Sequence, residues 1–106
     1  MRQEYNKLVR DHIPDFIAES GSQYETVELT DPEYHQALRD KLLEEATEAA
    51  TANPEQLAGE LADLLDVIDA LLENAGISQE SILLERDQKR ATKGGFTQKI
   101  KLLWVE

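Results

Sequence analysis

Residues 31–76 read DPEYHQALRDKLLEEATEAATANPEQLAGELADLLDVIDALLENAG, and this stretch decides the fold. It contains two helix-start signals, Asp31-Pro32-Glu33 and Asn53-Pro54-Glu55-Gln56. Asp and Asn can cap free backbone N–H groups, proline fits the first helical turn, and a glutamine three residues after the cap forms a capping-box pattern. We therefore predict one helix from Asp31 up to Asn53 and a second that begins at once and ends at Asn74-Ala75-Gly76.

Apolar residues recur at helical spacing in both segments, in the first as Leu38, Leu42, Ala46 and Ala49, and in the second as Leu57, Leu61, Leu64, Leu65, Ile68, Leu71 and Leu72. Because only Asn53 separates the two helices, we expect an antiparallel hairpin. The flanks add a short helix from Pro14 to Ser20 and a third long helix that starts at Ser78 and stops before Gly94-Gly95. The predicted fold class is all-α.

The flanking segments ETVEL (25–29) and KIKLLWV (99–105) have strand-like alternation, so we expect them to pair as a small β ribbon. With 106 residues and no internal repeat, the chain should form a single domain, 1–106, whose own core is small. Association with further copies would help such a chain to bury its apolar surface.

Composition excludes several classes of function. The formal net charge of −11 argues against nonspecific binding to nucleic acid or to an anionic membrane surface. The lack of cysteine rules out disulfides, zinc–thiolate sites and a thiol nucleophile. No apolar run has membrane-spanning length, and the start MRQEYNKLVR lacks the hydrophobic segment of a signal peptide, so we expect a cytoplasmic protein.

Two acidic clusters lie on the predicted hairpin. Counting residues outward from the turn at about 1.5 Å per residue places Glu48 near Glu60, and Glu45 near Asp63. The helical rotation of about 100° per residue puts these four carboxylates along the edge of the apolar arcs. Glu44 falls further toward solvent, and three acids of the second helix point away from the groove: Asp66, Asp69 and Glu73.

Four carboxylates at one groove repel one another. Lys41 lies one turn before Glu45, but one ammonium cannot balance four negative charges. Divalent cations suit a site made of oxygen ligands, and Mg²⁺ in particular binds carboxylates while it keeps waters and accepts phosphate oxygens. The spacing alone leaves two interpretations open, a metal site and an acidic hairpin whose charges are simply solvated.

The same residues resemble a known signature. Glu44-Glu45-Ala46-Thr47-Glu48, followed after eleven residues by Glu60-Leu61-Ala62-Asp63, is similar to the E-E-x-x-E and E-x-x-D motifs of the MazG-like all-alpha nucleoside triphosphate pyrophosphohydrolases. YNKLVRDHIP near the start and KRATKGGF near the end resemble the flanks of the phosphoribosyl-ATP pyrophosphohydrolase-like branch of that superfamily. The resemblance covers nearly the whole chain.

The resemblance implies an all-α bundle that is completed by a second copy or more, as a dimer or a tetramer. It implies cleavage between the α and β phosphates of a nucleotide that depends on Mg²⁺, with Mn²⁺ as a substitute. The metal ligands of the family fall on four positions of this chain: Glu45, Glu48, Glu60 and Asp63.

The sequence also suggests supporting residues. A carboxylate near the metal must orient or deprotonate the attacking water, and the candidates are Glu44, Glu45 and Glu48. No phosphate-binding G-x-x-x-x-G-K-[ST] loop is present. The candidate contacts to substrate phosphate are therefore the basic residues Lys7, Arg10, Lys41, Lys89, Arg90 and Lys93, although the flanking bases also fit ordinary helix-end and surface-pair roles.

The leading hypothesis is a nucleotide pyrophosphohydrolase that removes noncanonical nucleoside triphosphates. A second is hydrolysis of phosphoribosyl-ATP in histidine biosynthesis, which would share the acidic hairpin. A third, of another class, is an acidic helical module that binds a basic partner and catalyses nothing.

Overall fold

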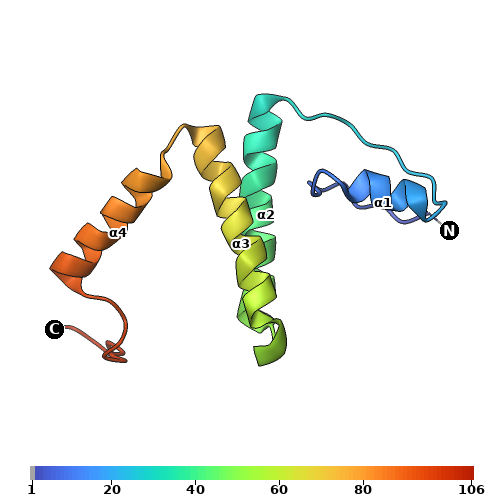
Figure 1. The fold of residues 1–106 in the computed structure, drawn as a ribbon. Coiled ribbons are helices and arrows are strands. Elements are labelled where there is room, and N and C mark those ends of the chain that lie inside the picture. The colour runs from blue at the N-terminus through green and yellow to red at the C-terminus, as the bar shows by residue number, and fades with distance from the viewer. Residues whose placement is uncertain (1) are drawn as a thin grey trace.

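The computed structural model describes residues 2–106 and consists of four helices joined by loops and extended segments (Figure 1). They are α1 (Ile13–Glu19), α2 (Asp31–Thr51), α3 (Pro54–Ala75) and α4 (Gln79–Lys93). No residue in the described range is in a strand. The all-α prediction and the order of the helices are confirmed.

The ends of the long helices follow from local side chains. Thr30, rather than Asp31, caps α2: its hydroxyl accepts a hydrogen bond from the Glu33 N–H, and the Glu33 carboxylate accepts one from the Thr30 N–H at 3.0 Å. Asn53 caps α3 by accepting a hydrogen bond from the Gln56 N–H at 2.9 Å. At the other end of α3, Gly76 adopts a left-handed conformation with φ of 69°, which a glycine tolerates without strain.

The helices α2 and α3 pack along one another as the predicted antiparallel hairpin, while α4 diverges from it on one side and α1 lies on the other (Figure 1). Leu38 of α2 and Val67 of α3 are the buried apolar residues of the described chain. Near the open end of the hairpin, His35 Nδ1 lies 2.7 Å from Asn74 Oδ1. The turn at Asn53 and this polar contact align the two helices along their length.

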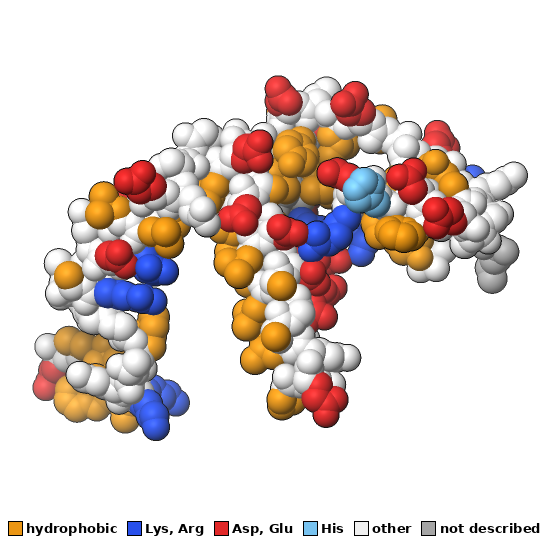
Figure 2. Space-filling model, viewed as in Figure 1, with side chains coloured by type: hydrophobic (Ala, Val, Ile, Leu, Met, Phe, Trp, Pro, Cys, Tyr) orange, Lys and Arg blue, Asp and Glu red, His pale blue; other side chains and the backbone are white. Residues whose placement is uncertain are grey.

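A single copy leaves much apolar surface open. Three leucines of α3, Leu57, Leu61 and Leu65, are exposed, and Figure 2 shows apolar side chains facing the gap between the hairpin and α4. The radius of gyration is 18.4 Å, whereas a compact chain of this length has about 13 Å. The accessible surface is 9770 Å², compared with about 6,000 Å² for a compact monomer of this mass.

The predicted β ribbon is not formed within the described chain. Residues 25–29 and 100–105 are extended, but they lie at opposite ends of the molecule and do not pair (Figure 1). The two segments have extended backbone, as the alternation indicated, but within one copy they do not pair. Within the described residues, the structure contains no helix with the length and apolar character needed to cross a bilayer.

Candidate metal centre

Three carboxylates converge where α2 and α3 face each other. Glu45 comes from the middle of α2, and Glu60 and Asp63 come from one face of α3, where a spacing of three residues stacks them on adjacent turns. One ligand oxygen from each residue lies within 4.8 Å of the other two. Glu45 is only 7% exposed, which is unusual for an acidic side chain.

Glu48 lies next to this group without belonging to the three converging ligands. Loss of solvation and then the Glu48 carboxylate raise the pKa of Glu45, and the same two causes raise the pKa of Glu60. Asp63 raises the pKa of both further. The fold thus holds like charges together in a place where water solvates them poorly.

Two oxygen atoms of the cluster, Glu45 Oε2 and Glu60 Oε2, are buried and have no hydrogen-bond partner in the described chain. Buried polar atoms are normally satisfied, because an unpaired one costs about 1–3 kcal/mol or more. An all-oxygen donor set with unused lone pairs is the environment that hard divalent cations such as Mg²⁺ require. The residues present therefore fit a divalent metal ion.

Lys41 lies beside the cluster as the sequence predicted. Its ammonium is 3.5 Å from Glu44 Oε2 and 3.7 Å from Glu45 Oε1, and its side chain is 17% exposed. This position allows Lys41 to offset part of the negative charge of α2.

The N-terminal segment supplies two further cations. Asn6 has a positive φ of 46°, a conformation that asparagine tolerates better than most residues, and side chains of the residues that follow reach the hairpin. Lys7 Nζ is 2.9 Å from Glu44 Oε1 on α2. Arg10 lies against α3, where Nη2 is 2.9 Å from Asp63 Oδ1 and Nη1 is 2.6 Å from Asp66 Oδ2.

These contacts place Lys7 and Arg10 on the rim of the acidic cluster, one on each helix. The hydrogen bond from Lys7 and the charge of Lys41 lower the pKa of Glu44, in contrast to the raised pKa of its neighbour Glu45. Glu44 is therefore a paired outer carboxylate. In Figure 2, basic side chains lie among acidic ones where the N-terminal segment meets the hairpin.

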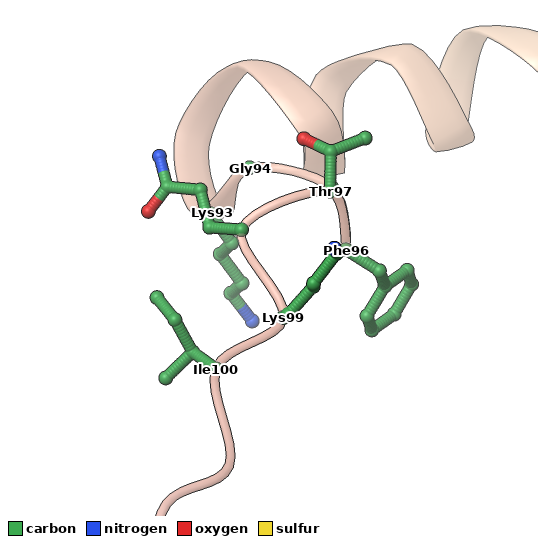
Figure 3. Close-up of a pocket in the computed structure, with 8 residues that line it drawn as sticks. Lys93, Gly94, Phe96, Thr97, Lys99 and Ile100 are labelled. Carbon is green, nitrogen blue, oxygen red and sulfur yellow. The ribbon is translucent and has the colours of Figure 1, made fainter.

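The basic residues predicted on α4 lie apart from this cluster within one copy. None of the ion pairs in the described chain joins Lys89, Arg90 or Lys93 to a carboxylate. Lys93 instead lines a pocket of about 230 Å³ at the turn after α4, together with Gly94 and Lys99 (Figure 3). The diverging path of α4 explains the separation, because α4 leaves the hairpin immediately after Gly76.

Sequence reasoning misjudged Asp66, which was expected to point away and instead shares Arg10 with Asp63. Because Asp63 and Asp66 are three residues apart, the sequence places them on adjacent turns of one helical face, but it does not show that Arg10 reaches them. Asp69 and Glu73 are exposed, as expected.

The family model for phosphoribosyl-ATP pyrophosphohydrolase matches residues 4–90, a range that includes the N-terminal cations, the whole hairpin and most of α4. No curated protein and no solved structure matches the chain. The chain therefore belongs to the phosphoribosyl-ATP pyrophosphohydrolase family, part of the MazG-like all-alpha nucleoside triphosphate pyrophosphohydrolases, whose members are divalent-metal-dependent hydrolases of phosphoric anhydrides.

Proposed function

We propose that this protein hydrolyses a nucleotide between its α and β phosphates in a reaction that depends on Mg²⁺, with Mn²⁺ as a substitute. The products are a nucleoside monophosphate and pyrophosphate. The observation that carries the proposal is the convergence of Glu45, Glu60 and Asp63 with two buried, unpartnered carboxylate oxygens. Membership in a family of pyrophosphohydrolases supports the same reaction class.

Glu45, Glu60 and Asp63 would hold the cation, and Glu48 joins them as the fourth ligand with a side-chain rotation, because it already neighbours Glu45 and Glu60. When bound, the cation neutralises phosphate oxygens and lowers the pKa of a water molecule. Glu44 would hold the attacking water in orientation once Lys7 leaves its Oε1 for the substrate. Glu48, the exposed carboxylate of the cluster, has an open side from which it can accept the proton of that water.

The cations on the rim have a matching role. Lys7 and Arg10 are exposed and lie on the outer carboxylates, so both can exchange those partners for the phosphates of an arriving substrate. Arg10 presents a planar fork that grips a phosphate with two parallel hydrogen bonds. Lys41, which is held between Glu44 and Glu45, is placed to neutralise ligand charge rather than to reach outward.

Two substrate classes fit this site. Noncanonical nucleoside triphosphates are the first, and their removal from the nucleotide pool would be a cytoplasmic task. Phosphoribosyl-ATP, an intermediate of histidine biosynthesis, is the second, and the name of the matched family favours it at least as strongly. Both carry a triphosphate for the acidic cluster, and they differ in what the base and ribose must contact.

A substrate panel tests the proposal. Pyrophosphate release is measured with canonical, deaminated and oxidised nucleoside triphosphates and with phosphoribosyl-ATP, each with Mg²⁺, with Mn²⁺ and with a chelator. We expect turnover of at least one compound that stops without the divalent ion. Asp63→Asn and Glu48→Gln should reduce kcat by a factor of about 100 or more while the helical circular dichroism signal stays unchanged.

Asp69→Asn is the matched control, because Asp69 is an exposed acid on α3 with no ion pair in the described chain and should keep wild-type activity. The proposal is wrong if no compound in the panel releases pyrophosphate and if the two cluster variants bind divalent ions as well as the wild type.

We also propose that the active form is a homo-oligomer, a dimer or a tetramer. The accessible surface of one chain exceeds that of a compact monomer by roughly 4,000 Å². Counted over two copies, the excess is larger than the total of about 2,000–5,000 Å² that permanent interfaces bury, so it is enough for an interface of that class. In such an assembly, α4 of one copy would bring Lys89, Arg90 and Lys93 to the acidic cluster of another.

A further inference from the structure

Two extended segments of the chain have unused backbone hydrogen-bonding groups. Residues 24–29 (YETVEL) precede α2, and residues 100–105 (IKLLWV) follow the turn after α4. In the described chain neither segment makes a backbone–backbone hydrogen bond. A row of free N–H and C=O groups on an extended chain is a template for pairing with another strand.

The side chains of the C-terminal segment are exposed to solvent, just as its backbone groups are unpaired. Ile100, Leu102, Leu103, Trp104 and Val105 are between 73% and 80% exposed, and Val27 in the other segment is 81% exposed. Five consecutive or near-consecutive apolar side chains in water form a patch of the kind that marks a contact with another molecule. Both segments are also rich in residues that favour strands, such as Tyr24 and Val27 in the first and Ile100 and Trp104 in the second.

The two segments cannot meet within one copy. A turn closed by the Lys99 N–H, which donates to the Phe96 carbonyl at 3.2 Å, sends the chain away from α4, and the Phe96 ring points away from the pocket (Figure 3). Residues 24–29 lie at the opposite side of a molecule whose longest dimension is 59 Å (Figure 1). Any pairing between them must therefore join two copies.

One antiparallel register suits both segments. With Glu28 opposite Lys101, Val27 faces Leu102 and Leu29 faces Ile100 on one side, while Tyr24 faces Val105 on the other. Opposite charges directly across an antiparallel pair are favourable, as are pairs of aromatic and β-branched side chains. A shift by one residue would remove the charge pair and exchange the two faces.

We propose that two copies of this chain exchange their ends, so that residues 100–105 of one copy pair antiparallel with residues 24–29 of the other, with Glu28 opposite Lys101. Because each copy has both segments, a two-fold arrangement forms the contact twice and closes the dimer. The proposal rests on the homo-oligomer proposed above and adds which surfaces hold it together. It does not depend on which nucleotide is hydrolysed.

Charge exchange between the two positions tests the pairing. Glu28→Lys and Lys101→Glu are made singly and together, and the dissociation constant of the assembly is measured by sedimentation velocity across a dilution series. Each single change places like charges at both junctions and should weaken association on the order of tenfold. The double variant, which restores opposite charges, should return to within about twofold of the wild type.

Lys99→Glu is the matched control, since it makes the same charge change two residues earlier and faces no acid in this register. Combined with Glu28→Lys, it should give no rescue. Trp104, the single tryptophan, supplies a second measurement: its emission should shift to shorter wavelength on association. Every second amide of 101–105, the set that points at the partner strand, should become protected from hydrogen exchange.

The outcomes separate the two proposals. If the chain stays monomeric at every concentration, both the proposed homo-oligomer and the proposed pairing are contradicted. The pairing alone is contradicted if the chain assembles but its dissociation constant does not respond to the charge exchange. It is also contradicted if, in the assembly, Trp104 stays exposed to water and the amides of 101–105 stay unprotected. Rescue of Glu28→Lys by Lys99→Glu as well as by Lys101→Glu would also contradict the register.

Discussion

The negative charge of Glu45, which metal binding would require, lowers the stability of the metal-free protein. Burial first, and then the Glu48 carboxylate, raise its pKa above the ordinary 4.5, so the fold favours the neutral acid over the carboxylate that a metal requires. The stability from this group is full below the ordinary pKa and is lost as the pH rises through the raised value. At neutral pH the metal-free protein therefore carries an unfavourable charge.

Glu45→Gln should consequently raise the melting temperature of the metal-free protein at pH 7, by about 5 °C for a gain near 1 kcal/mol. The difference from the wild type should shrink as the pH falls toward 4.5. Mg²⁺ should raise the melting temperature of the wild type and leave that of the variant unchanged. Differential scanning calorimetry with chelator and with Mg²⁺ checks both statements, and a variant less stable than the wild type at pH 7 would refute the account of the cluster.

The ion pairs of Arg10 would change when a metal ion or a substrate binds beside it. It pairs with Asp63, a candidate ligand, and with Asp66, which keeps hold of the guanidinium if Asp63 turns toward a cation. Its side chain is 57% exposed, so the pairs contribute little to stability. In the proposed reaction, Asp66 would thereby hold Arg10 in position.

Arg10→Ala should tighten divalent-ion binding in the absence of nucleotide, because Asp63 loses a competing cation, and should raise KM for the nucleotide by about tenfold. Unfolding free energy should change by less than about 1 kcal/mol. Isothermal titration with Mn²⁺ and steady-state kinetics measure the two effects. Arg86→Ala, which removes an equally exposed arginine that pairs with Asp87 on α4, should change neither.

At the scale of the helices, the start of α2 depends on a reciprocal pair. The Thr30 N–H and hydroxyl both donate to the Glu33 carboxylate and lower its pKa, the backbone N–H being the larger cause. A lowered carboxyl pKa gives stability that is present above the unfolded value and is lost as the pH falls through the folded one. Acid should therefore fray this helix end first.

Thr30→Ala should destabilise the protein by about 1 kcal/mol at pH 7, because it removes the cap of the helix that holds Glu45. The loss should decrease once the pH falls below the lowered pKa of Glu33, because the carboxyl is then protonated in the wild type as well. Thr47→Ala is the control on the same helix: its hydroxyl donates to the Leu43 carbonyl within the helix, and alanine is the better helix former, so stability should hold or rise. Urea unfolding at several pH values distinguishes the two variants.

These elements also mark what the sequence can predict. The starts and ends of α2, α3 and α4 follow from residues within a few positions of each boundary, and counting from Asn53 brought Glu45, Glu60 and Asp63 together because one short turn fixes the hairpin. The contact of Arg10 with Asp66 joins residues 56 positions apart, and no local pattern encodes it. That 25–29 and 99–105 do not pair within one copy was missed for the same reason, since alternation indicates an extended strand and does not say whether its neighbour lies in the same copy.

At the scale of the whole molecule, the acidic cluster and the basic end of α4 belong to one catalytic site only if copies assemble. Within one chain the cluster gathers six carboxylates around three cations, so it has an excess of negative charge that a phosphate would meet. Lys89, Arg90 and Lys93 carry positive charge without a carboxylate partner among the described ion pairs. Charge complementarity thus favours a site shared between copies.

Mixing two inactive variants tests this sharing. Glu45→Gln removes the metal ligand of its own copy, and the double change Arg90→Ala with Lys93→Ala removes the cations that its copy would lend. In a dimer that shares sites, each mixed dimer has one site with all its own ligands and all the lent cations, whereas the other site lacks both. When the two variants are mixed in equal amounts, half of the dimers contain one copy of each. One of the two sites in those dimers is complete, so the activity should recover to about a quarter of the wild type. As a control, each variant alone must first be shown to associate. If an equimolar mixture stays as inactive as its components after the subunits have exchanged, α4 contributes to the site of its own copy or to no site.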